Sequence, residues 1–145
     1  MARTLEELPL YSKVLEFCDA VSAMLRESDL RKNRKLYEQI DDANDSIDSN
    51  MQEGFQQSSD AAFANFVVTS KGSLAEVQSR TRQACRKGLV TDKHVARIEE
   101  LGEPTWEDDG RFHQVSAGVR LHGPWPPFRR STPAKAWEAL IRDSG

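Results

Sequence analysis

Residues 36–55, LYEQIDDANDSIDSNMQEGF, decide the fold prediction. Apolar residues recur there at intervals of three and four, and these are Leu36, Ile40, Ala43, Ile47, Met51 and Phe55. Such spacing places them on one side of a helix. The opposite side is acidic and carries Asp41, Asp42, Asp45 and Asp48. The segment therefore predicts an amphipathic helix over about residues 30–55, with Gly54 in its C-terminal cap region.

Three more helices are expected from the same kind of spacing, over about residues 10–26, 60–87 and 91–101. Thr91 or Asp92 would cap the last and shortest of them. Gly102 and Pro104 would stop it, because both residues disfavour a helix interior.

The four segments together predict an all-α, up-and-down four-helix bundle over residues 5–102. Residues 103–145 are richer in proline and tryptophan, and we expect an irregular C-terminal extension. We expect the extension to end in a short helix, because Thr132 and Pro133 fit an N-cap followed by proline at the first helical position.

Composition is that of a polar, single-domain protein. The chain has 145 residues, of which 38% are hydrophobic, and its net charge is -3. The N-terminus lacks the pattern of a signal peptide, and no run approaches the roughly 20 apolar residues of a membrane span. A cytoplasmic protein with no membrane association is therefore expected. Cys18 and Cys85 are interpreted as small core residues, since two isolated cysteines make neither a disulfide framework nor a metal site.

Charge is unevenly distributed along the sequence. Residues 1–60 carry 7 Lys and Arg against 13 Asp and Glu, whereas residues 61–102 carry 7 against 4. Such segregation fits complementary packing between subunits, and it also fits a basic nucleic-acid-binding face on an acidic body.

Two blocks of the sequence resemble a known family. Residues 46–55, SIDSNMQEGF, are similar to the hallmark S-I-P-S-N-I-A-E-G of the small four-helix-bundle proteins found as intervening-sequence proteins in bacterial 23S rRNA genes. The similarity continues at Phe63, at residues 71–76 (KGSLAE) and at residues 88–90 (GLV). It covers about residues 8–100. This family includes the accessory variability determinant proteins of diversity-generating retroelements.

The resemblance implies a function. It implies a non-catalytic homo-oligomer, a pentamer in the family's ring form, that binds nucleic acid and associates with a larger enzyme such as a reverse transcriptase. RNA is favoured over DNA. The sequence shows no nucleophile motif and no phosphate-binding glycine loop, so no enzymatic activity and no cofactor are expected. Asp48 stands where the family usually has proline, so the register of the second helix is open.

Nucleic-acid binding would use two basic clusters. The first comprises Arg31, Lys32, Arg34 and Lys35, and the second Lys71, Arg80, Arg82, Arg86, Lys87, Lys93 and Arg97. The alternative is an ordinary solvated helix face. Contacts would be made to the phosphate backbone, because nothing in the sequence is typical of a base-reading motif.

Six residues of the matching blocks are polar or small, namely Ser49, Asn50, Glu53, Gly72, Ser73 and Glu76. We expect them to form a polar network that fixes the register between the second and third helices, with Gly72 allowing close approach. The alternative is a metal or acid–base site using Glu53 and Glu76. Metal sites in bundles usually add Glu-x-x-His pairs, and the first three helices contain no histidine.

Four aromatic residues of the C-terminal part, Trp106, Trp125, Phe128 and Trp137, are candidate partner-binding residues. They would either dock on the chain's own bundle or anchor a partner protein, as aromatic side chains beside arginine often do. The second interpretation supports a rival function, in which the chain is a protein–protein adaptor that recruits its partner through this extension without binding nucleic acid.

Overall fold

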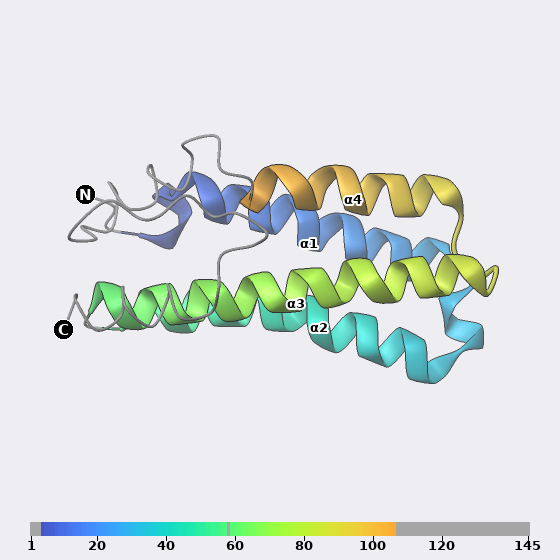
Figure 1. Ribbon diagram of the computed structural model, residues 1–145, viewed down its shortest axis with the longest axis horizontal. Coiled ribbons are helices and arrows are strands. Elements are labelled where there is room, and N and C mark those ends of the chain that lie inside the picture. Colours follow the sequence, from blue (N-terminus) through green and yellow to red (C-terminus); the bar gives the residue numbers. More distant parts are fainter. Residues whose placement is uncertain (1–3, 58, 107–145) are drawn as a thin grey trace, which may run out of the picture.

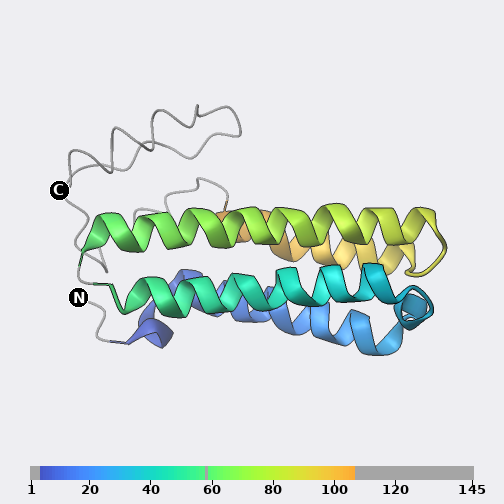
Figure 2. The ribbon, with the colours of Figure 1, turned by 90° about the horizontal axis from the view of Figure 1, so that it is seen from below.

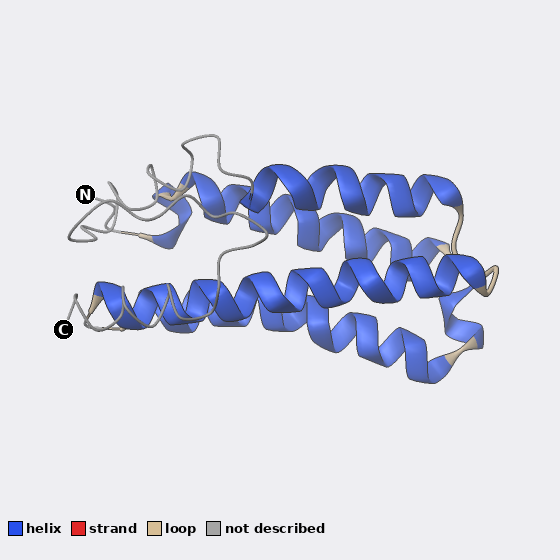
Figure 3. Cartoon of the chain, in the orientation of Figure 1, coloured by secondary structure: helices blue, strands red, loops and turns tan. Residues whose placement is uncertain are grey.

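The computed structural model describes residues 4–57 and 59–106 (Figure 1). They form four helices: α1 Pro9–Glu27, α2 Arg34–Phe55, α3 Asp60–Arg86 and α4 Asp92–Trp106. Short 3₁₀ turns, Leu5–Glu7 and Asp29–Lys32, precede α1 and α2. Figure 3 shows helices and connecting loops but no strand within these residues.

The helices run alternately up and down in two layers. α2 and α3 lie side by side along their whole length and cover the layer made by α1 and α4 (Figure 2). α1 packs against α2 and α4, and α3 packs against α2 and α4, so the bundle is closed. The prediction of an all-α, up-and-down four-helix bundle is confirmed. No helix of the described residues is long and apolar enough to span a membrane.

The core lies where the four apolar stripes meet. Phe17 of α1 is fully buried at its centre, and Ile40 and Ile47 of α2, Val77 of α3 and Ile98 of α4 are buried to a similar degree. Ile40 and Ile47 belong to the apolar stripe predicted for residues 36–55. Each helix therefore buries the side that its sequence periodicity marks as apolar.

α2 begins later than predicted. The expected helix started near Leu30, but the chain first forms the 3₁₀ turn Asp29–Lys32, in which Leu30 is fully buried. Asn33 then leaves the helical conformation, and its side-chain oxygen accepts a hydrogen bond from Leu36 N at 3.1 Å. This is N-cap geometry, and it sets the start of α2 at Arg34.

α4 is longer than predicted. The helix continues through Gly102 and Pro104 to Trp106 instead of stopping at them. Gly102 is buried where α4 meets the bundle, and a Cβ atom there would collide with the Gln78 amide and lie 3.2 Å from Phe17 Cε2. Glycine is thus needed at this position for close packing, and it does not mark the helix end.

The contact between α2 and α3 corrects two further predictions. Gly54 lies inside α2, and an added Cβ would be 2.5 Å from Phe66 Cβ, so the close approach of these helices depends on Gly54. Gly72, which was expected to allow that approach, is exposed and has no neighbour within 4 Å of an added Cβ. Gly54 is therefore a packing residue and not a cap, and Gly72 contributes nothing to the contact.

Polar contacts join α1 to α2 beside the core. The Tyr11 hydroxyl donates a hydrogen bond to Asp48 Oδ1 at 2.7 Å, and Asp48 Oδ2 accepts one from Gln52 Nε2 at 3.0 Å. Asp48 thus fastens α2 to α1. Burial and the hydrogen bond to Asp48 together raise the pKa of Tyr11 to about 12. Burial also raises the pKa of the Cys18 thiol to about 12.

The raised pKa values of Tyr11 and Cys18 predict that the fold loses stability at alkaline pH. Unfolded cysteine and tyrosine lose their protons near 9.0 and 10.0, whereas folded Cys18 and Tyr11 keep theirs to about 12. Proton release therefore favours the unfolded state, so the free energy of unfolding should fall as pH rises from about 9 to about 12. Urea unfolding at several pH values checks this. The Cys18→Ala, Tyr11→Phe double variant should show a shallower decline, and a decline equal to that of the unaltered chain would contradict the assignment.

Of the predicted partner-binding aromatics, Trp125, Phe128 and Trp137 lie outside the described residues, as does the predicted short terminal helix. Trp106 is the last residue of α4.

Candidate nucleic-acid interface

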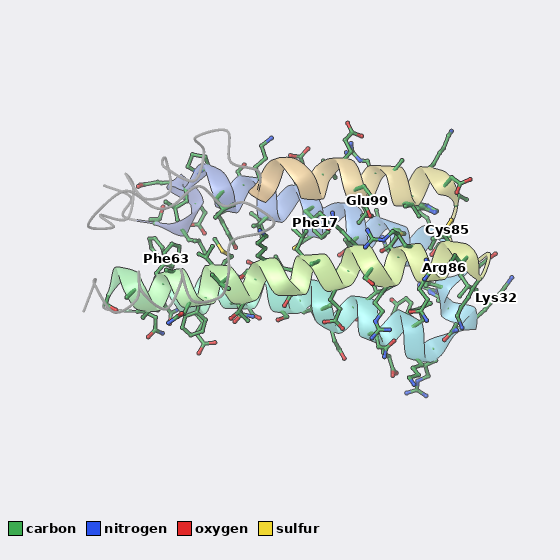
Figure 4. The ribbon with its side chains drawn as sticks, in the orientation of Figure 1. Phe17, Lys32, Phe63, Cys85, Arg86 and Glu99 are labelled. Carbon is green, nitrogen blue, oxygen red and sulfur yellow. The ribbon has the colours of Figure 1, made fainter. Side chains whose placement is uncertain are left out.

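Charge is segregated along the long axis of the bundle. Residues 29–39 and 79–94 meet at one end and carry nine Lys and Arg side chains against three Asp and Glu. Residues 4–19 and 41–60, toward the other end, carry one lysine against ten Asp and Glu. Figure 4 shows Lys32 and Arg86 at the end where α2 begins and α3 finishes. The antiparallel fold therefore converts two basic clusters, distant in sequence, into one surface, which we call the basic end.

The two loops of the basic end are held together by backbone hydrogen bonds. α3 closes with Gly88 in the left-handed conformation (φ 72°), and Leu89 N donates to Ala84 O at 2.9 Å. This is the Schellman geometry that glycine favours. Asp29 N then donates to Leu89 O at 3.1 Å across the loops. The positions of the neighbouring basic residues are thus fixed by backbone contacts.

α4 begins at the basic end with a reciprocal cap. Thr91 Oγ1 accepts a hydrogen bond from His94 N at 3.2 Å, and His94 Nδ1 accepts one from Thr91 N at 3.1 Å. Thr91, rather than Asp92, is therefore the N-cap residue, with His94 in the place usually taken by glutamate or glutamine.

A cleft of about 180 Å³ lies between the start of α2 and the end of α3. We call it the basic cleft, and its lining residues are Asn33, Lys35, Leu36, Gln39, Arg80, Gln83 and Lys87. Three of the seven carry a positive charge, three carry an amide, and Leu36 alone is apolar.

The positive charges of the basic cleft are not neutralised by neighbours. Among the described residues, no carboxylate lies within ion-pair distance of Lys35, Arg80 or Lys87. Other basic residues are paired: Lys32 with Asp29 at 3.5 Å, Arg34 with Glu38 at 2.7 Å, and Arg82 with Glu99. The cleft therefore combines unpaired positive charge with hydrogen-bond donors, which suits an anionic ligand.

The eleven predicted nucleic-acid-binding residues are only partly brought together. Lys35, Arg80 and Lys87 line the basic cleft, while Arg31, Lys32, Arg34 and Arg86 belong to the basic end but not to the lining of the cleft. Arg82, Lys93 and Arg97 belong to the neighbouring surface of α3 and α4, and Lys71 lies near the middle of α3.

The sequence pattern does not single out the amide residues of the basic cleft. Asn33, Gln39 and Gln83 are common surface residues, and nothing local distinguishes them. A signal was present in the helix register, however. Ser46 lies opposite Ser73, and an antiparallel pair in that register places Gln39 opposite Arg80 and Leu36 opposite Gln83.

Of the six predicted residues, Ser73 makes a polar contact between α2 and α3, and Asn50 supports that contact from within α2. The Ser46 and Ser73 hydroxyls are hydrogen-bonded at 2.9 Å, and Asn50 Nδ2 donates to Ser46 Oγ at 2.9 Å. Ser70 of α3 is fully buried and donates a hydrogen bond to Ile47 O of α2 at 2.9 Å.

The other predicted members of this network lie elsewhere. Ser49, Glu53 and Glu76 are exposed, and Ser49 Oγ donates to Ser46 O within its own helix. Within the described residues, no three His, Cys, Asp or Glu side chains gather closely enough to hold a metal ion.

Comparison with known proteins relates the chain to a described family. A family model described as 23S rRNA-intervening sequence protein matches residues 6–104, more than half of the chain. A comparison with curated proteins finds no match. The matched region comprises all of α1, α2 and α3 and most of α4.

Proposed function

The chain belongs to the 23S rRNA-intervening sequence protein family, and from this premise we propose that it is a non-catalytic protein that binds the phosphate backbone of RNA at its basic end. The observation that supports the proposal is the convergence of Lys35, Arg80 and Lys87 on one cleft without neutralising carboxylates. Positive side chains placed close to phosphates release condensed counterions, and this release drives salt-dependent binding.

The charge distribution also favours one end of the bundle for binding. The opposite end of the bundle is acidic and would repel nucleic acid, so the net charge of -3 does not oppose binding at the basic end. The lining of the basic cleft supplies amides and cations but no aromatic platform. Such a lining favours contact with phosphate over stacking on bases.

We further propose that the chain self-assembles and serves a larger enzyme, such as a reverse transcriptase, as the family resemblance implies. Assembly would repeat the basic end and make several weak phosphate contacts act together. The described surface offers little apolar area for this, since Val68 is its one exposed large apolar side chain. Contacts between described surfaces would therefore be mainly polar. Light scattering after gel filtration, with and without RNA, measures the size of the assembly.

Charge reversal at the basic cleft tests RNA binding. The Lys35→Glu, Arg80→Glu, Lys87→Glu variant should bind a single-stranded RNA about 30-fold more weakly at low salt. The slope of log affinity against log salt should become shallower by about one, because the phosphate bound in the cleft is no longer neutralised. Fluorescence anisotropy at several salt concentrations measures both quantities.

Lys13→Glu is the matched control for a single Lys87→Glu change. Both reverse one exposed lysine and alter net charge equally, but Lys13 lies in α1 near the acidic end. Lys87→Glu should weaken binding and Lys13→Glu should not. Equal effects of the two changes, or an unaltered affinity of the triple variant, would disprove binding at the basic end. If the unaltered chain ignores RNA at low salt, the adaptor function becomes the better proposal.

A further inference from the structure

We propose that the basic cleft is a site for a phosphate monoester, and that its ligand is the phosphorylated end of an RNA strand rather than an internal phosphodiester. The proposal rests on the RNA-binding function proposed above and specifies which phosphate is bound. Three features of the cleft carry it: the orientation of its amides, its concentration of charge, and its size.

In two of the three amides of the cleft, Asn33 and Gln83, the oxygen already accepts a hydrogen bond within the protein. Asn33 Oδ1 already accepts the hydrogen bond from Leu36 N, and Gln83 Oε1 accepts one from Arg80 Nη1 at 3.2 Å. Each of these oxygens is therefore occupied by the protein itself, and the –NH₂ group of each amide is left to donate. The Gln83 contact also holds the Arg80 guanidinium beside the cleft. A ligand would meet a surface of N–H donors on both helices.

The charge of the cleft favours a dianion. Lys35 approaches from α2, and Arg80 and Lys87 approach from α3, so positive charge lies on both walls. An internal phosphodiester carries one negative charge, whereas a terminal phosphate carries about 1.5 to 2 at neutral pH. The first turn of α2 adds the positive end of its helix dipole. Charge-assisted hydrogen bonds from several donors would therefore favour the terminal group.

The size of the cleft fits a phosphate group. The cleft has a volume of about 180 Å³. That space suits one phosphate group with part of its hydration shell. A continuous strand would have to enter and leave the cleft, whereas a chain end can enter phosphate first.

Three RNAs of one sequence test the proposal, with a 5′-phosphate, a 3′-phosphate or hydroxyls at both ends. A hydroxyl-ended RNA two nucleotides longer serves as a control for total charge, because a terminal phosphate carries about two charges and each added phosphodiester carries one. A phosphorylated end should bind about tenfold more tightly than the longer hydroxyl-ended RNA. This preference should shrink at a pH of about 5, where the monoester loses its second charge and the diesters do not change. The charged groups lining the cleft are Lys35, Arg80 and Lys87.

Lys87→Gln and Arg86→Gln form a matched pair. Each removes one exposed positive charge at the end of α3, but only Lys87 lines the cleft. Both changes should weaken binding of hydroxyl-ended RNA by a similar factor, and only Lys87→Gln should abolish the preference for a phosphorylated end. Gln83→Leu leaves the charge unaltered and should reduce the same preference without changing the salt dependence.

Competition identifies the source of the monoester. If adenosine monophosphate or inorganic phosphate displaces the phosphorylated RNA at concentrations near the RNA's own dissociation constant, the site takes a free phosphate. If neither does so below millimolar concentration while the tenfold preference holds, the site takes an RNA end. Equal binding of all RNAs of equal charge would overturn the monoester site. Salt-dependent binding of hydroxyl-ended RNA would then still stand as evidence for the proposed function.

Discussion

Replacing Asn44 with aspartate should lower the free energy of unfolding by about 3–5 kcal/mol at neutral pH. Asn44 of α2 is 4% exposed, and its Nδ2 donates to Cys18 O at 3.2 Å and to Ser22 Oγ at 3.5 Å. Within the described residues its Oδ1 is buried without a partner. A carboxylate would place a second oxygen against the Cys18 carbonyl and add a buried charge near Asp19, Asp45 and Asp48.

The pH dependence of Asn44→Asp identifies the cause of its effect. Burial and the neighbouring carboxylates would raise the pKa of the new acid above the ordinary value of about 3.9. The unfolded chain then loses its proton at lower pH than the folded chain, so the destabilisation should be smaller near pH 4 and should grow toward pH 7. Urea unfolding of the variant and the unaltered chain, compared at each pH, measures this difference.

Asn44→Leu is the control. It removes the two hydrogen bonds donated by Nδ2 together with the unpartnered oxygen at similar volume, so the free energy of unfolding should fall by only about 1–2 kcal/mol. If Asn44→Leu costs as much as Asn44→Asp, the amide itself is essential and the argument from buried charge is wrong.

Gly54→Ala should lower the free energy of unfolding by about 2–3 kcal/mol, although alanine is the better helix former by about 1 kcal/mol. The new methyl group would lie 2.5 Å from Phe66 Cβ and 3.2 Å from Phe63 Cδ2. Phe66 Cβ is bonded directly to the α3 backbone, so a rotamer change cannot relieve the clash. α2 and α3 would have to move apart and lose packing along the first turns of α3.

Alanine substitutions at two other helical glycines, Gly72 and Gly102, serve as comparisons for Gly54→Ala. Gly72→Ala should raise the free energy of unfolding by about 0.5–1 kcal/mol, because the site is exposed and has space for the methyl group. The change in the free energy of unfolding caused by Gly102→Ala should lie between those of Gly54→Ala and Gly72→Ala. The Gln78 amide can move away from the new methyl group, whereas Phe17 cannot. Urea unfolding followed by circular dichroism, at one protein concentration, gives the three values. A stabilised Gly54→Ala chain would show that the helices are not in close contact there.

The candidate site was only partly predictable. Basic residues are recognisable in any sequence, so Lys35, Arg80 and Lys87 were all among the predicted residues. Asn33 and Gln83 were not, because an amide becomes informative only when its oxygen is seen to be occupied by another group. The charge count by sequence segment also misled, since it assigned the first 60 residues to one acidic body although their basic cluster lies at the basic end.

The sequence by itself determined the helices and the side that each one buries, because a spacing of three and four residues has one geometric meaning on a helix of 3.6 residues per turn. It also determined the family, through two blocks of local sequence. Tertiary structure decided what depends on distance across helices. It showed that Gly54 and Gly102 are packing residues while Gly72 is exposed, that α4 passes Pro104, and that Asp48 bonds to Tyr11. Close approach and charge pairing depend on which side chains meet in space, and a one-dimensional pattern does not contain that information until the register between helices is known.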